Sequence, residues 1–262
     1  MTETDPHKAK DNSYADYFIK DGKHLGLYEE MYAKCPDPWR IEELGLRLDM
    51  QAALLLLGSS KGPFPRVLDL GAGAGFFSLA VIEELLKAQL MAESEAPSAE
   101  EGTSSKPTSI IEYFLVDMSQ TALNKALEKI SSALQSKGKM PLLKLKAIPL
   151  DLRELDLRAK EEKLLLPSSF DLVILAQTLW GILENLENTL IAINRLLAPQ
   201  GSFLISQHFP KDQKYGKDIL KSPEELIDYL LKTGFSPLRT IETDRNTNHH
   251  FAVLSEKKST LA

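Results

Sequence analysis

Short apolar runs and longer amphipathic stretches alternate along most of the chain. Five apolar runs have the length and composition of buried strands, and they cover residues 66–70, 110–116, 143–148, 170–176 and 201–207. The stretch after the fourth run repeats an apolar residue every three or four positions, at Leu183, Leu186, Leu190, Ile193 and Leu197. This spacing predicts an amphipathic helix. Strands that alternate with helices predict a parallel sheet with helices on both faces.

Different patterns flank this alternating region. Residues 1–60 have a helical pattern, interrupted at Pro36-Asp37-Pro38, and we expect an N-terminal helical extension there. Near the other end, a helix is expected to begin at Pro223 and to be capped by Gly234. The apolar segments that follow it are expected to close the sheet as an antiparallel hairpin. The sequence therefore predicts an α/β fold, with the core domain at residues 61–258.

One segment inside the core domain departs from this pattern. Residues 91–109, between the first helix and the second strand, are rich in Glu, Ser, Ala, Thr and Pro and contain almost no large apolar residue. Such a composition cannot supply a packed core. We predict a flexible, solvated insertion.

Composition and charge narrow the classes of function. The chain has 262 residues, of which 43% are hydrophobic and 26% charged, as in an ordinary globular protein. A net charge of −6 argues against nucleic acid as a partner, because phosphate binding needs clustered Lys and Arg. The only cysteine, Cys35, cannot form an intramolecular disulfide, and no Cys/His cluster has metal-ligand spacing. We expect a small-molecule substrate and no metal; the sequence does not indicate the oligomeric state.

No targeting or membrane signal is evident. The first residues carry acids and a proline where a secretory signal would have basic residues and an apolar stretch. The longest apolar run, residues 52–57, is too short to span a bilayer. We therefore expect a cytoplasmic protein that does not insert into membranes.

A glycine-rich turn, Gly71-Ala72-Gly73-Ala74-Gly75, joins the first strand to its helix. Such a turn lets the backbone approach a ligand closely and presents free N–H groups at the helix N-terminus. A dinucleotide fingerprint would need Gly or Ala three residues after the second glycine, where this chain has Phe76. A phosphate-binding P-loop would need Gly-Lys-Ser or Gly-Lys-Thr, which does not follow Gly75. The nicotinamide interpretation is weakened, and the P-loop interpretation fails.

With Asp69 in front of its alternate glycines, the turn resembles the first motif of class I methyltransferases. The resemblance implies a Rossmann-like three-layer sandwich and S-adenosylmethionine as the cofactor. It also implies that the amino-acid end of the cofactor is held by Asp69, Gly71, Ala72, Gly73 and Gly75.

The resemblance extends over residues 64–208. Asp117, followed by Met118, ends the second strand where the family has an acid for the ribose, and a carboxylate offers two acceptors to the two hydroxyl donors of a diol. Asp151, followed by Leu152, matches the polar position beside the adenine, where it would accept from the amino group. Gln177 ends the strand that lies beside the methyl group in the family.

A narrower resemblance concerns the acceptor. The segment Asp37-Pro38-Trp39 looks like the entrance segment of nodulation-type N-methyltransferases, which act on amino-sugar substrates. It implies an amino sugar or another amine or hydroxyl acceptor. We expect the N-terminal extension to fold over the cofactor as a lid. The candidate acceptor-binding residues are Tyr32, Trp39, Trp180 and His208.

His208 is the candidate catalytic residue. An imidazole has an unperturbed pKa of about 6.5, so it can accept a proton near neutrality. No acid follows the fourth strand, where some small-molecule methyltransferases have one. Two alternatives stay open: a non-catalytic sensor that binds S-adenosylmethionine, and a nicotinamide-dependent oxidoreductase. Trp180 could also be a core aromatic residue, and Asp69 and Asp117 could be turn or helix-capping residues.

Overall fold

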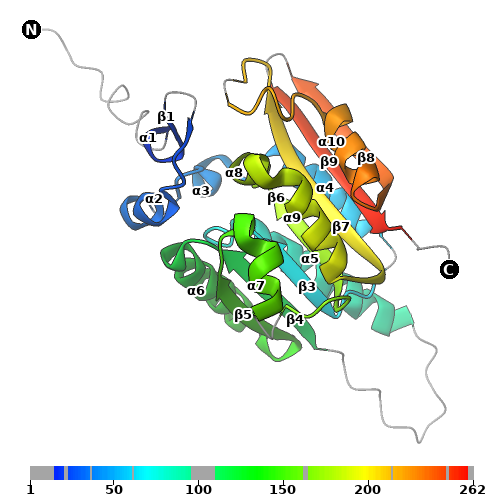
Figure 1. The fold of residues 1–262 in the computed structure, drawn as a ribbon. Coiled ribbons are helices and arrows are strands. Elements are labelled where there is room, and N and C mark those ends of the chain that lie inside the picture. The colour runs from blue at the N-terminus through cyan, green and yellow to red at the C-terminus, as the bar shows by residue number, and fades with distance from the viewer. Residues whose placement is uncertain are drawn as a thin grey trace, which may run out of the picture.

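The computed structural model describes residues 15–20, 23–35, 37–60, 62–95, 110–161, 165–213, 215–245 and 248–258. Its centre is a seven-stranded sheet in the order β5-β4-β3-β6-β7-β9-β8 (Figure 1). The five parallel strands are β3 (Arg66–Leu70), β4 (Ile111–Asp117), β5 (Leu143–Pro149), β6 (Phe170–Ala176) and β7 (Leu197–Pro210). The predicted antiparallel hairpin consists of β8 (Phe235–Arg245) and β9 (Asn248–Lys257). The predicted mostly parallel sheet is confirmed.

The strand order reverses direction at β3. From β3 the chain proceeds outward through β4 to β5, then returns to the other side of β3 to form β6 and β7. The connections that follow β3 and β6 therefore leave the sheet in opposite directions. In open α/β sheets this switch point creates a crevice at the carboxyl ends of the strands, where ligands bind.

Helices cover both faces of the sheet. One face carries α4 (Leu48–Gly58), α5 (Phe76–Glu95) and α6 (Gln120–Ser136). The other carries α7 (Leu155–Glu161), α8 (Leu179–Ile182), α9 (Leu186–Leu196) and α10 (Pro223–Lys232). Short 3-10 turns lie at Met140–Leu142, Leu152–Glu154 and Leu183–Asn185. Within the described ranges no helix is long and apolar enough to cross a membrane.

Two hydrophobic cores lie on opposite sides of the sheet. In β3, Val67 packs in the core under α4 and α5, whereas Leu68 and Leu70 pack in the core under α9. In β4, Tyr113 and Phe114 divide in the same way. Successive side chains of a strand point to opposite faces, and here both faces are buried. This is why these strands read as continuous apolar runs, and it confirms the three-layer sandwich.

The N-terminal extension is less regular than its helical pattern indicates. Two helices, α1 (Ala15–Phe18) and α2 (Tyr28–Lys34), flank a small antiparallel hairpin of β1 (Ile19–Lys20) and β2 (Lys23–His24), and α3 (Ile41–Leu44) follows. Two-residue strands are too short to show a period of two, so the sequence did not indicate the hairpin. The last helix of the extension, α4, packs on the sheet against β7, β8 and β9. A domain boundary at residue 60 stays a proposal.

The segment predicted as an insertion begins with helix. Helix α5 continues to Glu95, into the 91–109 segment. Met91, Ala92 and Glu93 are good helix formers, so propensity extends the helix past its buried part. The other residues of that segment, 96–109, lie outside the described residues.

Candidate functional site

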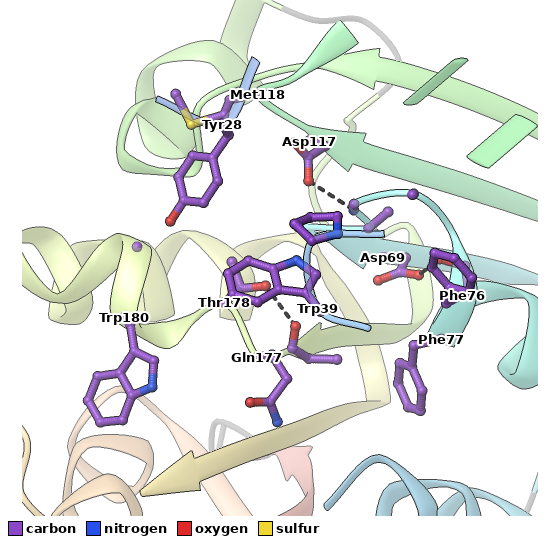
Figure 2. Close-up of a pocket in the computed structure, with 18 of the residues that line it drawn as sticks. Tyr28, Trp39, Asp69, Phe76, Phe77, Asp117, Met118, Gln177, Thr178 and Trp180 are labelled. Atoms are coloured by element: carbon purple, nitrogen blue, oxygen red, sulfur yellow. Dashed lines mark hydrogen bonds between the residues drawn. The ribbon is translucent and has the colours of Figure 1, made fainter. Parts of the chain in front are cut away.

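A cavity of about 330 Å³ opens at the carboxyl ends of the parallel strands. Its walls come from the loops after β3, β4, β5 and β6, from the end of β7 and from the N-terminal extension (Figure 2). Its volume lies near the lower end of the roughly 300–1,000 Å³ that is usual for small-ligand sites. The cavity therefore occupies the crevice that the strand order creates.

The glycine loop after β3 forms one wall of the cavity. A Cβ atom at Gly71 would collide with the side chain of Thr178, which follows β6. A Cβ atom at Gly75 would lie 2.7 Å from the Cβ atom of Ala126 in α6. Both glycines also have positive φ angles, 75° and 77°. The alternation of glycines thus lets one loop turn tightly between two neighbouring elements. Gly75 faces α6 and is absent from the described cavity lining.

Asp69 places a buried carboxylate at the base of this loop. Its Oδ2 atom accepts hydrogen bonds from the hydroxyls of Ser78 at 2.6 Å and Tyr113 at 2.9 Å. Burial raises the pKa of Asp69 to about 6, although these two hydrogen bonds favour the ionised form. The carboxylate is therefore ionised at neutral pH and gives this wall a negative charge.

Asp117 ends β4 and joins it to the glycine loop. Its Oδ2 atom accepts from the backbone N–H of Gly73 at 2.9 Å (Figure 2), and its Oδ1 atom accepts from the N–H of Ser119 at 2.9 Å. Burial raises the pKa of Asp117 to about 6, and the N–H groups of Ser119 and Gly73 partly oppose this shift. Each oxygen keeps a further acceptor position, so the carboxylate can still receive two ligand hydroxyls.

The loop after β5 supplies the third acid. Asp151 caps the turn at Leu152–Glu154 through the N–H of Arg153 and also accepts from the Arg153 guanidinium, with Nε at 3.0 Å. Burial would raise the pKa of Asp151, but Arg153 holds it below its usual value. Both Asp151 and the buried Leu152 line the cavity, as does the exposed Met118 after β4. The Asp151 carboxylate is therefore already engaged, a contact that the motif did not reveal.

The opposite end of the cavity has aromatic and imidazole walls. Gln177 adopts a left-handed backbone with φ of 56°, which is unusual for a residue other than glycine, and lines the cavity beside Trp180 (Figure 2). The ring of Trp180 packs edge-on against Phe209 of β7, with centroids 5.6 Å apart. His208, also from β7, reaches the same cavity. This end contains no carboxylate among its described lining residues.

The N-terminal extension covers the cavity. The indole Nε1 of Trp39 donates to the hydroxyl of Tyr32 at 3.1 Å. That hydroxyl lies so close to Gly73 that a Cβ atom there would be 2.5 Å from it. Tyr32 is 4% exposed, so its ring is enclosed between α2 and the loop. The predicted residues Tyr32 and Trp39 therefore meet the predicted cofactor residues in one cavity.

Polar contacts attach this cover to α6. Glu29 of α2 accepts from the hydroxyl of Ser119 at 2.7 Å and also from Thr121, at the beginning of α6. One turn further, Lys125 donates to the backbone carbonyl of Tyr32 at 2.5 Å. Because α6 begins at Gln120, three residues after Asp117, these contacts attach the extension close to Asp117. Such contacts between residues about 90 positions apart leave no local signal in the sequence.

The comparisons with known proteins agree with this geometry. A family model described as a methyltransferase domain matches residues 65–230. The chain belongs to the methyltransferase domain family. The match spans the parallel strands, the glycine loop and the ends of β4 to β7. No curated protein sequence matches the chain.

Solved methyltransferase structures share the fold of this methyltransferase. The N-methyltransferase NodS from Bradyrhizobium japonicum WM9, in complex with S-adenosyl-L-homocysteine, is 14% identical with a TM-score of 0.60, over 88% of this chain and 99% of that one. The Burkholderia thailandensis 1,6-didemethyltoxoflavin-N1-methyltransferase is 16% identical with a TM-score of 0.57, over 99% of this chain and 93% of that one. The magnesium protoporphyrin IX methyltransferase ChlM from Synechocystis PCC 6803 is 15% identical with a TM-score of 0.55, over 89% of this chain and 96% of that one.

The protein is a class I methyltransferase that uses S-adenosylmethionine. Family membership, the Rossmann-like sheet and the Asp69 glycine motif occur together in it. This decides against the nicotinamide-dependent oxidoreductase. The site also fits the cofactor, because the methyltransferase has an acceptor-rich Asp117 for a diol and a negative wall at Asp69 for an ammonium group. No group of three or more His, Cys, Asp or Glu side chains in the described ranges could hold a metal ion.

We predict that Asp117→Asn weakens the binding of S-adenosylhomocysteine by about 1–3 kcal/mol, the range for lost charge-assisted hydrogen bonds. For the wild-type protein, affinity should fall as the pH drops below about 6, because Asp117, with its raised pKa, then becomes protonated and loses acceptor capacity. Isothermal titration calorimetry at about pH 7.5 and about pH 5.5 measures both effects.

Asp156→Asn is the matched control for this experiment. Asp156 lies on α7, pairs with Arg195 and is absent from the described cavity lining, so its variant should bind like the wild type. A folded Asp117→Asn protein with unchanged affinity at neutral pH would remove Asp117 from the cofactor site.

Proposed function

We propose that this methyltransferase transfers the methyl group of S-adenosylmethionine to an amine or hydroxyl group of a small molecule. The observation that carries the proposal is the mixed lining of one cavity. The acids and the glycine loop line it together with Trp39, Trp180 and His208. A cofactor and an acceptor can therefore meet inside it.

The cofactor part would hold S-adenosylmethionine through the motif residues. Asp117 offers two carboxylate oxygens to the ribose hydroxyls, and Asp69 with the loop of Gly71, Ala72 and Gly73 faces the amino-acid end. Met118, Asp151 and Leu152 would surround the adenine, and Gln177 would lie beside the methyl group. When bound, the cofactor supplies an electrophilic methyl group on a sulfonium that is a good leaving group.

The acceptor part would align the nucleophile and exclude water. Trp39 and Trp180 come from different elements, and both line this cavity. Holding two reactants in line and away from water is the main contribution that a protein makes to such a transfer. Aromatic faces also stabilise a positively charged ammonium group, which favours an amine over a hydroxyl acceptor.

His208 would accept the proton that the nucleophile releases. Its ring stacks on that of His250, with centroids 5.0 Å apart and planes inclined by 29°. The Nδ1 atom of His250 lies 3.0 Å from Oδ1 of the buried Asp49. The stacked pair is thus held against α4, which orients the His208 imidazole at the cavity wall.

The comparisons support a nitrogen acceptor. NodS and the toxoflavin-precursor enzyme are both described as N-methyltransferases. The Asp37-Pro38-Trp39 segment, which resembles the nodulation-type enzymes, lies at the cavity through Pro38 and Trp39. An amino sugar is one such acceptor, and other small amines share its chemistry.

A sensor without catalytic activity is the second candidate. The observation that favours it is the absence of an acid among the described residues at the end of β6, where Gln177 and Thr178 stand. Binding of S-adenosylmethionine without methyl transfer would support it.

We predict that the protein transfers a trideuteromethyl group from labelled S-adenosylmethionine to a small amine. The assay uses a low-mass metabolite filtrate and a panel of amines and amino sugars, and mass spectrometry detects the label.

His208→Gln should lower turnover by about 10²-fold, the lower range for loss of a general base, and should leave S-adenosylhomocysteine binding unchanged. His249→Gln, whose imidazole pairs with Glu242, is the control. Cofactor binding with no labelled product would favour the sensor, and wild-type turnover by His208→Gln would exclude its role.

We also predict that Trp39→Ala lowers kcat/KM for the acceptor by about tenfold, because it removes an aromatic wall and the hydrogen bond to Tyr32. Leu44→Ala is the matched control, since Leu44 lies in the same extension, is 68% exposed and does not line the cavity. Steady-state kinetics with the acceptor found above compares the two. Equal kcat/KM values would show that the extension is no lid.

A further inference from the structure

A buried carboxylate lies behind one wall of the cavity. Asp49, the second residue of α4, is 0% exposed and is absent from the described cavity lining. Much of α4 packs in the core through apolar side chains such as Met50, Ala53 and Leu56. Packing therefore gives no reason for an acid at this position, and an isolated buried charge would be costly. The contacts of Asp49 indicate another role.

One contact leads from Asp49 to Gln177 through Ser206 of β7. Oδ2 of Asp49 accepts from the Ser206 hydroxyl at 3.1 Å, and that hydroxyl accepts from Nε2 of Gln177 at 3.4 Å. An ionised carboxylate can only accept hydrogen bonds, so it takes the single hydroxyl hydrogen of Ser206. The Ser206 oxygen can then only accept, which turns the NH₂ group of Gln177 towards β7. The carbonyl oxygen of this amide, Oε1, is thereby kept for another donor.

A second contact leads from Asp49 to His208 through His250 of β9. Nδ1 of His250 lies 3.0 Å from Oδ1 of Asp49, and the carboxylate can only accept, so this nitrogen carries the hydrogen. The His250 side chain is 12% exposed, and its ring stacks on that of His208, its cross-strand neighbour. The bond to Asp49 thus fixes the ring face against which His208 packs. The Arg47 guanidinium, with Nε 3.5 Å from the same oxygen, balances the charge of the carboxylate.

Both chains of contacts end at residues that line the cavity, Gln177 and His208. We propose that Asp49 is a positioning residue for methyl transfer and touches neither reactant itself. It acts on Gln177 through Ser206, and on His208 through His250. The inference rests on the proposed function, because that function places methyl transfer beside these two side chains. One buried acid thus orients two acceptors, the Gln177 carbonyl oxygen and the His208 imidazole, and such acceptors suit a reacting group that donates hydrogen bonds, as an amine does.

Three substitutions separate these links. Asp49→Asn keeps the size of the side chain, but its amide can donate to Ser206 and to His250, so neither partner keeps a fixed orientation. Ser206→Ala interrupts only the link to Gln177. His250→Phe keeps a ring for His208 to pack against and removes only the bond to Asp49. If Asp49→Asn does not fold, the other two variants still test the links.

Leu56→Ala is the matched control. Leu56 is 3% exposed in the same helix, packs in the core under α4 and α5 and is absent from the described cavity lining. Its truncation leaves a void and lowers the melting temperature, but kcat should stay at the wild-type value while the protein is folded. A loss of kcat that this control does not share is therefore more than a loss of stability.

The first measurement needs no acceptor substrate. Nitrogen-15 NMR of the histidine side chains shows which ring nitrogen of His250 carries hydrogen, and His250→Phe assigns its signals. We expect Nδ1 to carry hydrogen in the wild type and in Leu56→Ala, and a mixture of the two tautomers in Asp49→Asn. A wild-type His250 with hydrogen on Nε2 alone would overturn the proposal, because Asp49 would then not hold the ring.

The second measurement is turnover, with the acceptor that the labelled-methyl assay identifies. We expect Asp49→Asn to lower kcat about tenfold, because small displacements of positioned groups slow the transfer. Its dissociation constant for S-adenosylhomocysteine should stay within about twofold of the wild-type value.

Two double-mutant cycles test the links themselves. Ser206→Ala should cost no further turnover in a Gln177→Met protein, and His250→Phe none in a His208→Gln protein. Residues that act through one another are not additive, whereas independent structural damage would add.

The proposal is overturned if Asp49→Asn turns over like the wild type, or if the paired substitutions are additive. Because wild-type turnover is measured beside them, these results would leave the proposed function standing. A wild-type protein that binds S-adenosylhomocysteine but methylates no amine would instead contradict the proposed function, and this inference with it.

Discussion

The hydrogen bond between the Asp117 carboxylate and the backbone N–H of Gly73 is the contact on which the rest of the site depends. It joins the end of β4 to the loop after β3, at the point where the strand order reverses. The same carboxylate also accepts from the backbone N–H of Ser119, whose own side chain caps α6 and donates to Glu29 of α2. The glycine loop, β4, α6 and the N-terminal extension are thus connected through Asp117 and Ser119. Burying that acid raises its pKa, and the free energy of two backbone hydrogen bonds partly offsets this cost.

The side chains that line the cavity come from both halves of the sheet. The carboxyl ends of β3 and β4 and the loop after β5 bring three carboxylates together, whereas β6, β7 and the extension bring aromatic rings, an imidazole and one guanidinium. The hydroxyl of Tyr32, which packs on Gly73 and accepts from Trp39, connects the halves.

Much of the fold could be predicted from the sequence, because its strongest signals are local. Strand β6 was predicted at 170–176 because burial on both faces leaves an uninterrupted apolar run. The loop after β3 was predicted from its alternate glycines, which the structure requires because Thr178 and Ala126 leave no room for side chains at Gly71 and Gly75. Hairpin β1–β2 was missed because its strands have two residues. Glu29 was missed because its contacts with Ser119 and Thr121 join residues that are far apart in the chain. Asp151 was predicted as a cavity residue, but not its engagement by the neighbouring Arg153.

The most direct test of this account is a crystal structure of the protein with S-adenosylhomocysteine. We expect the ribose hydroxyls within hydrogen-bond distance, about 2.7–3.0 Å, of the two carboxylate oxygens of Asp117. The amino-acid end should lie along the loop of Gly71 and Gly73, with Tyr32 over it. A ligand that binds in this cavity with its ribose away from Asp117, or that binds outside the cavity, would contradict the account.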